Sequence, residues 1–315
     1  MTTGWRITSP TIPSPFDKCR RVLRDTMKTK GCMDMPQFDR YNCTDREFRA
    51  VKLYEGGKMP GETDEFYRQK SAYKTLNLLM MAGREGEYVR VCVEGQKPTG
   101  LFIRRWEDTM QALTDIFAVQ CRCALSQKAA GKPLPHPLSR GDRGVNFRLM
   151  EAAGGTFAFT STTEGEVLDD FVRGKQDPHA LHMSIADGVP YLDFQEFLGE
   201  DYYYTDQREI LLPPMVKMAC GPCRVVEHEG IGPVRHYDIR FTHVDTDFDR
   251  RDEGELTAVL NDLRDAAAVG LDDLTENKEN AAVLHDEGHP YWTWKEAFRQ
   301  LTMQRMAEVY REYYK

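Results

Sequence analysis

The sequence predicts an α+β protein in which helices come first, a block of strands follows, and helices return at the end. Apolar residues recur at three-and-four spacing in 64–83, in 101–127 and again after residue 253, as in amphipathic helices. Between them, six short segments rich in β-branched and aromatic residues alternate with turn residues, as strands do. Because the two kinds of element are segregated along the chain, we expect α+β rather than alternating α/β.

The composition is typical of a globular protein with a hydrophobic core. The chain has 315 residues, of which 41% are hydrophobic and 29% charged, enough for one large domain or two small ones. A formal net charge of −8 argues against tight nonspecific binding of nucleic acid. We expect no membrane span, because no apolar stretch approaches ~18 residues. We expect no secretory signal, because the N-terminus has no apolar core preceded by positive charge. Eight cysteines then indicate reduced thiols in a cytosol.

The first third of the chain predicts an irregular arm followed by helices. Residues 1–20 are rich in Pro, Ser and Thr, and a short helix is expected within 44–56. Longer helices are predicted over 64–83, with Gly83 as a stop, and over 101–127. The stretch "AAGKPLPHP", with three prolines and a glycine, then breaks the structure.

The strand block and the closing helices follow. The predicted strands are "TFAFTST", "LHMSIAD", "PYLDFQEF", "EILLPPMVKM", "CRVVEHE" and "RHYDIRFTHVD", and "HEGIGPVRH" predicts a hairpin loop between the last two. The predicted helices are "GELTAVLNDLRDAAAVG" and "WTWKEAFRQLTMQRMAEVYREYY". We expect an N-terminal arm over 1–60, a main domain over 61–250, and a C-terminal helical extension over 251–315 packed on the same domain.

Three polar motifs occur in order within or beside the strands. They are "PLSRGDR", then "FAFTSTTEGEVLDDF" at a strand end and helix start, then "QREILLPP", where polar residues enter an apolar strand. The residues that we single out in them are Arg140, Gly141, Ser161, Thr162, Phe171, Gln207 and Glu209.

Arginine, serine-threonine and glutamate motifs in this order resemble the mono-ADP-ribosyltransferases of the Arg-Ser-Glu class, here with a Gln-x-Glu catalytic motif. The similarity covers about residues 60–245 and includes 73–78, which looks like an early helix of that family. The resemblance implies N-terminal helices followed by a split two-sheet β core. It also implies that NAD is a substrate and that no metal takes part.

The resemblance implies a role for each motif. Arg140, with Gly141, binds the NAD pyrophosphate, because a guanidinium binds phosphate oxygens bidentately. Glu209 stabilises the oxocarbenium-like state formed when the nicotinamide–ribose bond breaks, and Ser161 fixes the Glu209 rotamer. The other NAD-binding residues implied are Thr162 and Phe171.

The chain departs from the family pattern around the arginine. Arg140 and Ser161 lie close together in the sequence for this family, and Ser139 stands where a tyrosine is usual. Arg143 and Arg148 are therefore alternatives to Arg140 as the phosphate-binding residue.

The residues before Glu209 bear on the acceptor. Because strand residues two apart share a face, Gln207 is expected beside Glu209, one step outward, where the acceptor arrives. Tyr202, Tyr203 and Tyr204 are expected on a loop that faces the acceptor and stacks on it. Arginine-directed members usually carry a glutamate at the position of Gln207, so the neutral amide favours an Asn or Gln side chain or a nucleobase.

The expected function is therefore mono-ADP-ribosylation of a macromolecule, protein or nucleic acid, with release of nicotinamide. We expect action in the cytoplasm, reached directly or after export by a signal-less route. If the chain is a toxin or an effector, we expect an immunity or regulatory partner that binds it. An NAD glycohydrolase and a catalytically silent NAD-binding module are the alternatives that the sequence leaves open.

Three other motifs resemble known sites. "CGPC" at 220–223 has the redox Cys-x-x-Cys form, but a strand is expected after it where thioredoxin has a helix, so we expect strand-edge cysteines. A zinc site joining them to His228 or His236 lacks a second regular pair. The histidines of 285–290 lie in a segment that Gly and Pro interrupt, and 245–255 lacks the glycine and glutamate of a calcium loop.

Overall fold

The computed structural model describes residues 41–56, 62–68, 72–81, 105–166, 169–175, 177–199, 202, 208–266 and 290–315. Its helices are α2 (Asp45–Glu55), α3 (Ala72–Leu79), α6 (Trp106–Ala129), α7 (Gly144–Ala153), α8 (Asp169–Val172), α9 (Phe194–Leu198), α10 (Glu253–Ala266) and α12 (Pro290–Tyr313). Its strands are β1 (Leu138–Arg143), β2 (Thr160–Glu164), β3 (Pro178–Ile185), β4 (Leu192–Asp193), β5 (Glu209–Leu212), β6 (Val216–Cys220), β7 (Arg224–His228) and β8 (Gly232–Val244). The predicted arm at 1–20 lies outside the described residues.

Helix α2 confirms the short helix expected within 44–56. Thr44 and Glu47 form a capping box that satisfies backbone N–H groups of the first turn. An ion pair of 2.7 Å between Arg46 and Asp115 joins α2 to α6. Although α2 precedes the predicted main-domain boundary at residue 60, it packs against the helix at the centre of the core.

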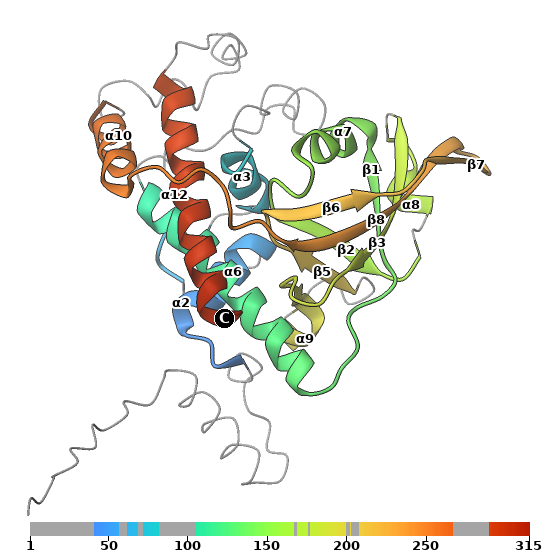
Figure 1. The fold of residues 1–315 in the computed structure, drawn as a ribbon, viewed down its shortest axis with the longest axis horizontal. Coiled ribbons are helices and arrows are strands. Elements are labelled where there is room, and N and C mark those ends of the chain that lie inside the picture. The colour runs from blue at the N-terminus through green and yellow to red at the C-terminus, as the bar shows by residue number, and fades with distance from the viewer. Residues whose placement is uncertain are drawn as a thin grey trace, which may run out of the picture. The chain divides into compact units, whose positions relative to one another are not determined.

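Helix α6 is that central helix. Met110, Leu113 and Phe117 have no exposed surface, which is what an apolar stripe at helical spacing predicts. The side-chain amide of Gln120 donates to the carbonyl of Leu211, 2.8 Å away, and ties α6 to the sheet. Helix α12, red in Figure 1, packs on α6, and together with α2 these helices lie on one side of the strands.

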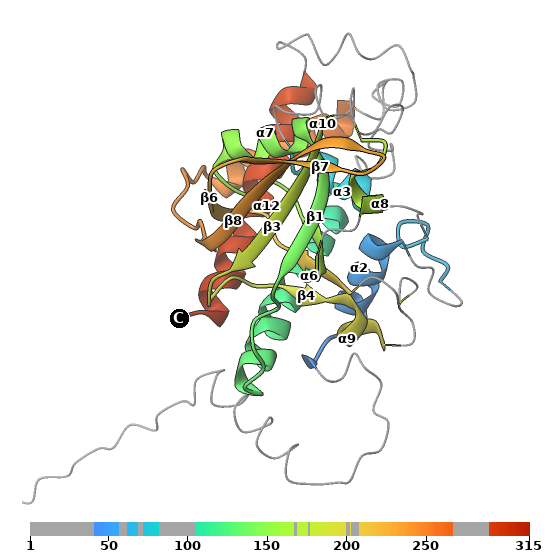
Figure 2. The same ribbon diagram turned by 90° about the vertical axis from the view of Figure 1, so that its right-hand side faces the viewer.

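The described strands form one hydrogen-bonded sheet in the order β4–β5–β2–β1–β3–β8–β6, with β7 also paired to β8. β3 and β8 are parallel, and the other pairs are antiparallel. The mixture of helices and sheet agrees with the sequence prediction, but the split into two sheets is not confirmed, because β1 pairs on both sides. Figure 2, turned by 90°, shows β1 and β3 running beside each other within this sheet.

The junction between β2 and β1 is nevertheless short. Only Leu138 with Glu164 and Ser139 with Thr163 are paired, whereas β1 stays paired with β3 as far as Arg143. β1 and β2 therefore separate after Ser139, and Arg140 is the first residue beyond the junction. The partial separation of the two strands is the feature that shapes the candidate site.

The structure contains the expected hairpin, and it places Cys220 and Cys223 at strand ends, as the sequence predicts. β7 and β8 pair antiparallel around a turn at 229–231. Cys220 ends β6, and β7 begins directly after Cys223, so the chain continues as strand where a thioredoxin-like site needs a helix. Both cysteines are free and exposed.

Some elements differ from the prediction. The strand expected over 190–197 is only the two residues of β4, because Asp193 accepts a hydrogen bond from the N–H of Glu196 and starts α9. Of the helix expected over 64–83, the structure describes a turn at 65–68 and α3. Helix α7 was not predicted at all.

Candidate active site

The pairing of β2 with β5 brings Ser161 and Glu209 together. Thr163 lies opposite Glu209 and Ser161 opposite Leu211, so Ser161 and Glu209 are diagonal neighbours on one face of the pair. The Ser161 hydroxyl donates to Oε1 of Glu209 at 2.5 Å. The expected contact between these two side chains is therefore present in the structure.

Both carboxylate oxygens of Glu209 accept hydrogen bonds. Ser161 donates to Oε1, and the hydroxyl of Tyr202 donates to Oε2 at 3.1 Å. Burial raises the pKa of Glu209, the two hydroxyl donors oppose that shift, and the negative charge of Glu55 adds to it. The net direction is upward, so Glu209 is a half-buried carboxyl group whose ionised form is favoured by its two donors.

Arg140 lies where β1 leaves β2. Its Nη1 donates to the backbone carbonyl of Ser161 at 2.6 Å, and its Nε donates to Oδ2 of Asp142 at 2.7 Å. Asp142 is buried, and its Oδ1 accepts from the N–H of Arg143 and the side-chain amide of Asn146. Burial raises the pKa of Asp142, but Arg140, the N–H of Arg143 and the charge of Lys175 outweigh it, so the pKa is lowered. Asp142 thus stays ionised and orients the guanidinium.

Gly141 allows α8 to approach β1. A Cβ on Gly141 would lie 2.5 Å from the carbonyl oxygen of Phe171 and 2.6 Å from its Cβ, closer than any side chain permits. The ammonium of Lys175 donates to the Gly141 carbonyl at 2.5 Å. Gly141, which follows Arg140 on β1, is therefore in close contact both with Phe171 of α8 and with Lys175, which comes after the end of that helix.

Several predicted residues have other positions. Thr162 points away from Ser161, because neighbouring strand residues face opposite sides, and its buried hydroxyl donates to the carbonyl of Ile210. Tyr202 was expected to face an acceptor, yet only 2% of it is exposed, so its ring belongs to the interior. The remaining expected residues, Gln207, Tyr203 and Tyr204, lie outside the described residues.

The alternative arginines lie elsewhere. Arg148 is on the outer face of α7, where its Nη1 is 3.2 Å from a carboxylate oxygen of Asp177. Arg143 precedes α7 as its N-cap residue. Arg140 donates a hydrogen bond to the backbone carbonyl of Ser161 in the serine motif, which favours it as the phosphate-binding candidate.

Three residues near the site were missed. Asp142 follows Arg140 by two positions on β1, so the period of a strand already placed them on one face. Tyr54 and Glu55, at the end of α2, come from a segment outside the recognised similarity. No local pattern links α2 to Glu209, because their proximity is set by tertiary packing.

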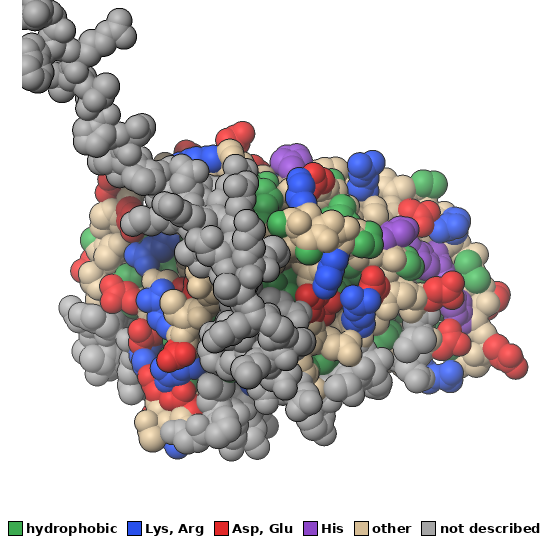
Figure 3. Space-filling view, turned by 90° about the horizontal axis from the view of Figure 1, so that it is seen from below, with side chains coloured by type: hydrophobic (Ala, Val, Ile, Leu, Met, Phe, Trp, Pro, Cys, Tyr) green, Lys and Arg blue, Asp and Glu red, His purple; other side chains and the backbone are tan. Residues whose placement is uncertain are grey.

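Histidines form a hydrogen-bonded chain beside the site. His182 Nε2 lies 2.8 Å from His236 Nδ1, His236 Nε2 lies 2.9 Å from His228 Nε2, and His228 Nδ1 lies 2.8 Å from Asp169. Figure 3, which views the molecule from below, shows several histidine side chains close together toward its right-hand end. Among the described residues, no group of three or more His, Cys, Asp or Glu side chains is arranged for a metal ion.

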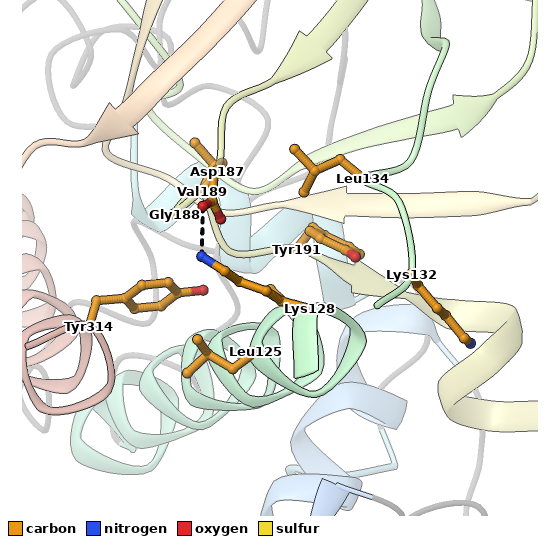
Figure 4. A pocket seen from close by; sticks show the side chains of 10 residues that line it. Leu125, Lys128, Lys132, Leu134, Asp187, Gly188, Val189, Tyr191 and Tyr314 are labelled. Carbon is orange, nitrogen blue, oxygen red and sulfur yellow. Dashed lines mark hydrogen bonds and ion pairs between the residues drawn. The ribbon is translucent and has the colours of Figure 1, made fainter. Parts of the chain in front are cut away.

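A cavity of about 220 Å³ lies apart from this site, at the C-terminal end of α6. Figure 4 shows Lys128 directed toward Asp187, with Tyr191 and Tyr314 nearby. The ion pair between Lys128 and Asp187 measures 2.6 Å. None of the residues singled out from the motifs lines it. No helix in the described part of the chain is long and apolar enough to cross a membrane.

Comparison with known proteins yields structural neighbours only. No family model and no curated protein matches the chain. It is similar to Plx2a, an ADP-ribosyltransferase toxin from Paenibacillus larvae, with a TM-score of 0.37 and 14% identity over 71% of this chain and 95% of Plx2a. It is also similar to C2-I, the enzymatic component of the Clostridium botulinum C2 toxin, with a TM-score of 0.39 and 13% identity over 65% of this chain and 45% of C2-I. At such similarity, the argument for function rests on the side chains.

Proposed function

We propose that the chain is an NAD-dependent mono-ADP-ribosyltransferase of the Arg-Ser-Glu class. The observation that carries the proposal is the contact of three motifs far apart in the sequence. Arg140 binds the backbone of Ser161, 21 residues away, and Ser161 binds the carboxylate of Glu209, a further 48 residues away. Chance motifs have no reason to meet in this way.

The proposed chemistry assigns one task to each group. Arg140 binds the pyrophosphate of NAD, and its side chain remains 28% exposed while Asp142 orients it. Glu209 accepts a hydrogen bond from a ribose hydroxyl and stabilises the positive charge that develops at C1′. The bond from C1′ to the nicotinamide nitrogen breaks, and nicotinamide leaves with the electron pair. The acceptor then bonds to C1′ and gives up a proton.

The residue at position 207 bears on which group accepts the ADP-ribose. Gln207 lies two residues before Glu209 and would face the acceptor on the same side of the strand. A neutral amide both donates and accepts hydrogen bonds, which suits an amide side chain or a base edge. Guanidinium, which only donates, is better matched by a carboxylate. We therefore propose an Asn or Gln side chain or a nucleobase as the acceptor.

Transfer from labelled NAD tests the function and the acceptor together. The purified chain is incubated with cell lysate and NAD labelled in the adenylate, and the products are digested with protease or nuclease. We expect a labelled polymer with the wild type and none with Glu209→Gln, while Gln207→Ala loses labelling more than nicotinamide release. Nicotinamide release with no labelled polymer would instead identify an NAD glycohydrolase. No NAD consumption by the wild type would refute the proposal.

A further inference from the structure

Tyr202 contacts the carboxylate that the proposed reaction needs. Its hydroxyl lies 3.1 Å from Oε2 of Glu209, whereas Ser161 occupies Oε1. A carboxylate held at one oxygen can still rotate about its last side-chain bond, but donors at both oxygens fix its plane. Tyr202 therefore supplies the second constraint on Glu209.

The ring of Tyr202 is itself held by aromatic packing. It is stacked on Phe194 with an interplanar angle of 5° and ring centroids 6.0 Å apart. Phe194 is stacked in turn on Tyr54 of α2, at 14° and 6.4 Å. All three side chains are almost completely buried. Stacked rings leave the phenol little freedom, so its hydroxyl is directed at Glu209.

Tyr54 is anchored on its other side. The side-chain amide of Asn77 donates to the Tyr54 hydroxyl at 3.1 Å, and the rings of Tyr54 and Phe159 pack edge to face with centroids 5.5 Å apart. The column of rings Tyr54–Phe194–Tyr202 thus begins on α2 and α3 and ends at Glu209. Helix α2, outside the segment that resembles the family, is part of the support of the site.

The protonation states fit a donor role for Tyr202. Burial first, and the charge of Glu209 second, raise the pKa of Tyr202, so the phenol keeps its proton. A donor to the carboxylate favours the ionised form of Glu209, against the effect of burial. Removing that donor would leave Glu209 protonated up to a higher pH.

We propose that Tyr202 is a positioning residue, which holds Oε2 of Glu209 through its hydroxyl and keeps the carboxylate oriented and ionised. This inference rests on the proposed function for its kinetic consequence. It gives Tyr202 a role inside the site rather than at the acceptor.

The Tyr202→Phe variant tests the inference because it removes the hydroxyl and keeps the ring. We expect kcat for nicotinamide release to fall about tenfold or more, as for loss of a hydrogen bond to a charged group, with KM for NAD little changed. The acid limb of the kcat profile should move to higher pH. Tyr310→Phe is the matched control, since its hydroxyl donates to the Gly188 carbonyl and lies outside the proposed site. Wild-type kcat and an unshifted profile in Tyr202→Phe would overturn the inference.

A measurement without turnover separates this inference from the proposed function. The Glu209 carboxyl is titrated by carbon NMR in selectively labelled wild type and in Tyr202→Phe. We expect its pKa to be higher in Tyr202→Phe, and an unchanged pKa would refute the positioning role whatever the activity. A higher pKa in a protein that does not cleave NAD would refute the function and support the contact. Phe194→Leu, which loosens the ring but keeps the hydroxyl, should show a smaller shift in the same direction.

Discussion

Replacing Asp142 with asparagine tests how the guanidinium of Arg140 is held. Asp142 is 3% exposed and accepts from Arg140 Nε at 2.7 Å, from the N–H of Arg143 at 2.8 Å and from the Asn146 amide at 2.6 Å. Asparagine keeps an oxygen for one or two of these donors. It turns an N–H toward Arg140 and removes the charge that compensates the guanidinium.

The magnitude follows from the burial of the pair. Removing one partner of a fully buried ion pair costs about 3–5 kcal/mol, because the other charge is left unpaired. Since the Arg140 side chain is 28% exposed and water can screen part of its charge, we expect about 2–4 kcal/mol for Asp142→Asn. Arg140 would also lose its orientation, so KM for NAD should rise about tenfold, the equivalent of about 1.4 kcal/mol.

The pH dependence gives an internal check. The pKa of Asp142 is lowered in the folded protein, so its contribution to the free energy of unfolding is present above the ordinary value of 3.8 and is lost as the pH falls below it. The stability difference between wild type and Asp142→Asn should therefore be largest near neutral pH and shrink in acid.

Denaturant unfolding followed by circular dichroism measures the stability, and initial rates at varied NAD measure KM. Asp187→Asn is the control, because Asp187 forms an exposed ion pair with Lys128 and should change stability little. A loss in Asp142→Asn no greater than about 0.5 kcal/mol, the scatter of surface substitutions, together with an unchanged KM would refute the reasoning.

Three further predictions concern Glu209, Gly141 and His179. Glu209→Gln should raise the melting temperature near neutral pH. Because the pKa of Glu209 is raised in the folded protein, the free energy of unfolding of the wild type falls as the pH rises above 4.5. A variant no more stable than the wild type would contradict the claim that burial of the Glu209 carboxylate costs stability. Gly141→Ala should lower the free energy of unfolding by about 1–3 kcal/mol, because the added Cβ would lie 2.5 Å from the Phe171 carbonyl oxygen. An unchanged melting temperature would contradict this prediction and show that α8 can move away from β1. His179 is buried, and burial is the main reason that its pKa is lowered, so the free energy of unfolding of the wild type should fall as the pH drops below 6.5. In urea titrations, His179→Phe should lose this dependence of stability on pH. The same pH dependence in both proteins would contradict the prediction.

Sequence periodicity predicted the elements that packing and capping support together. Helices α2, α6 and α12 combine an apolar stripe with long or well-capped segments, so local and tertiary preferences agree. At 190–197 they conflict, since aromatic residues favoured a strand while the Asp193 cap with Glu196 favoured the short helix α9. There the cap decides: the helix that begins at Phe194 limits β4 to Leu192 and Asp193, which pair with β5.

The residues of the candidate site that lie in short sequence motifs could be predicted from the sequence. Ser161 is the second residue of β2 and Glu209 is the first residue of β5, so both belong to short polar segments that the sequence marks. The two-residue period of a strand also places Asp142 on the same face as Arg140. The position of Tyr202 could not be predicted from the sequence. A tyrosine in a polar loop favours an exposed position, and only its stacking on Phe194 makes it part of the interior.

The most direct test of the central claim is nicotinamide release from NAD by the wild type and by Glu209→Gln, with NAD binding measured calorimetrically on the same preparations. We predict that the wild type releases nicotinamide, that Glu209→Gln is slower by about a hundredfold or more, and that both bind NAD with similar affinity. Equal release by the two proteins, or no release by the wild type, would contradict the assignment of Glu209 as the catalytic carboxylate.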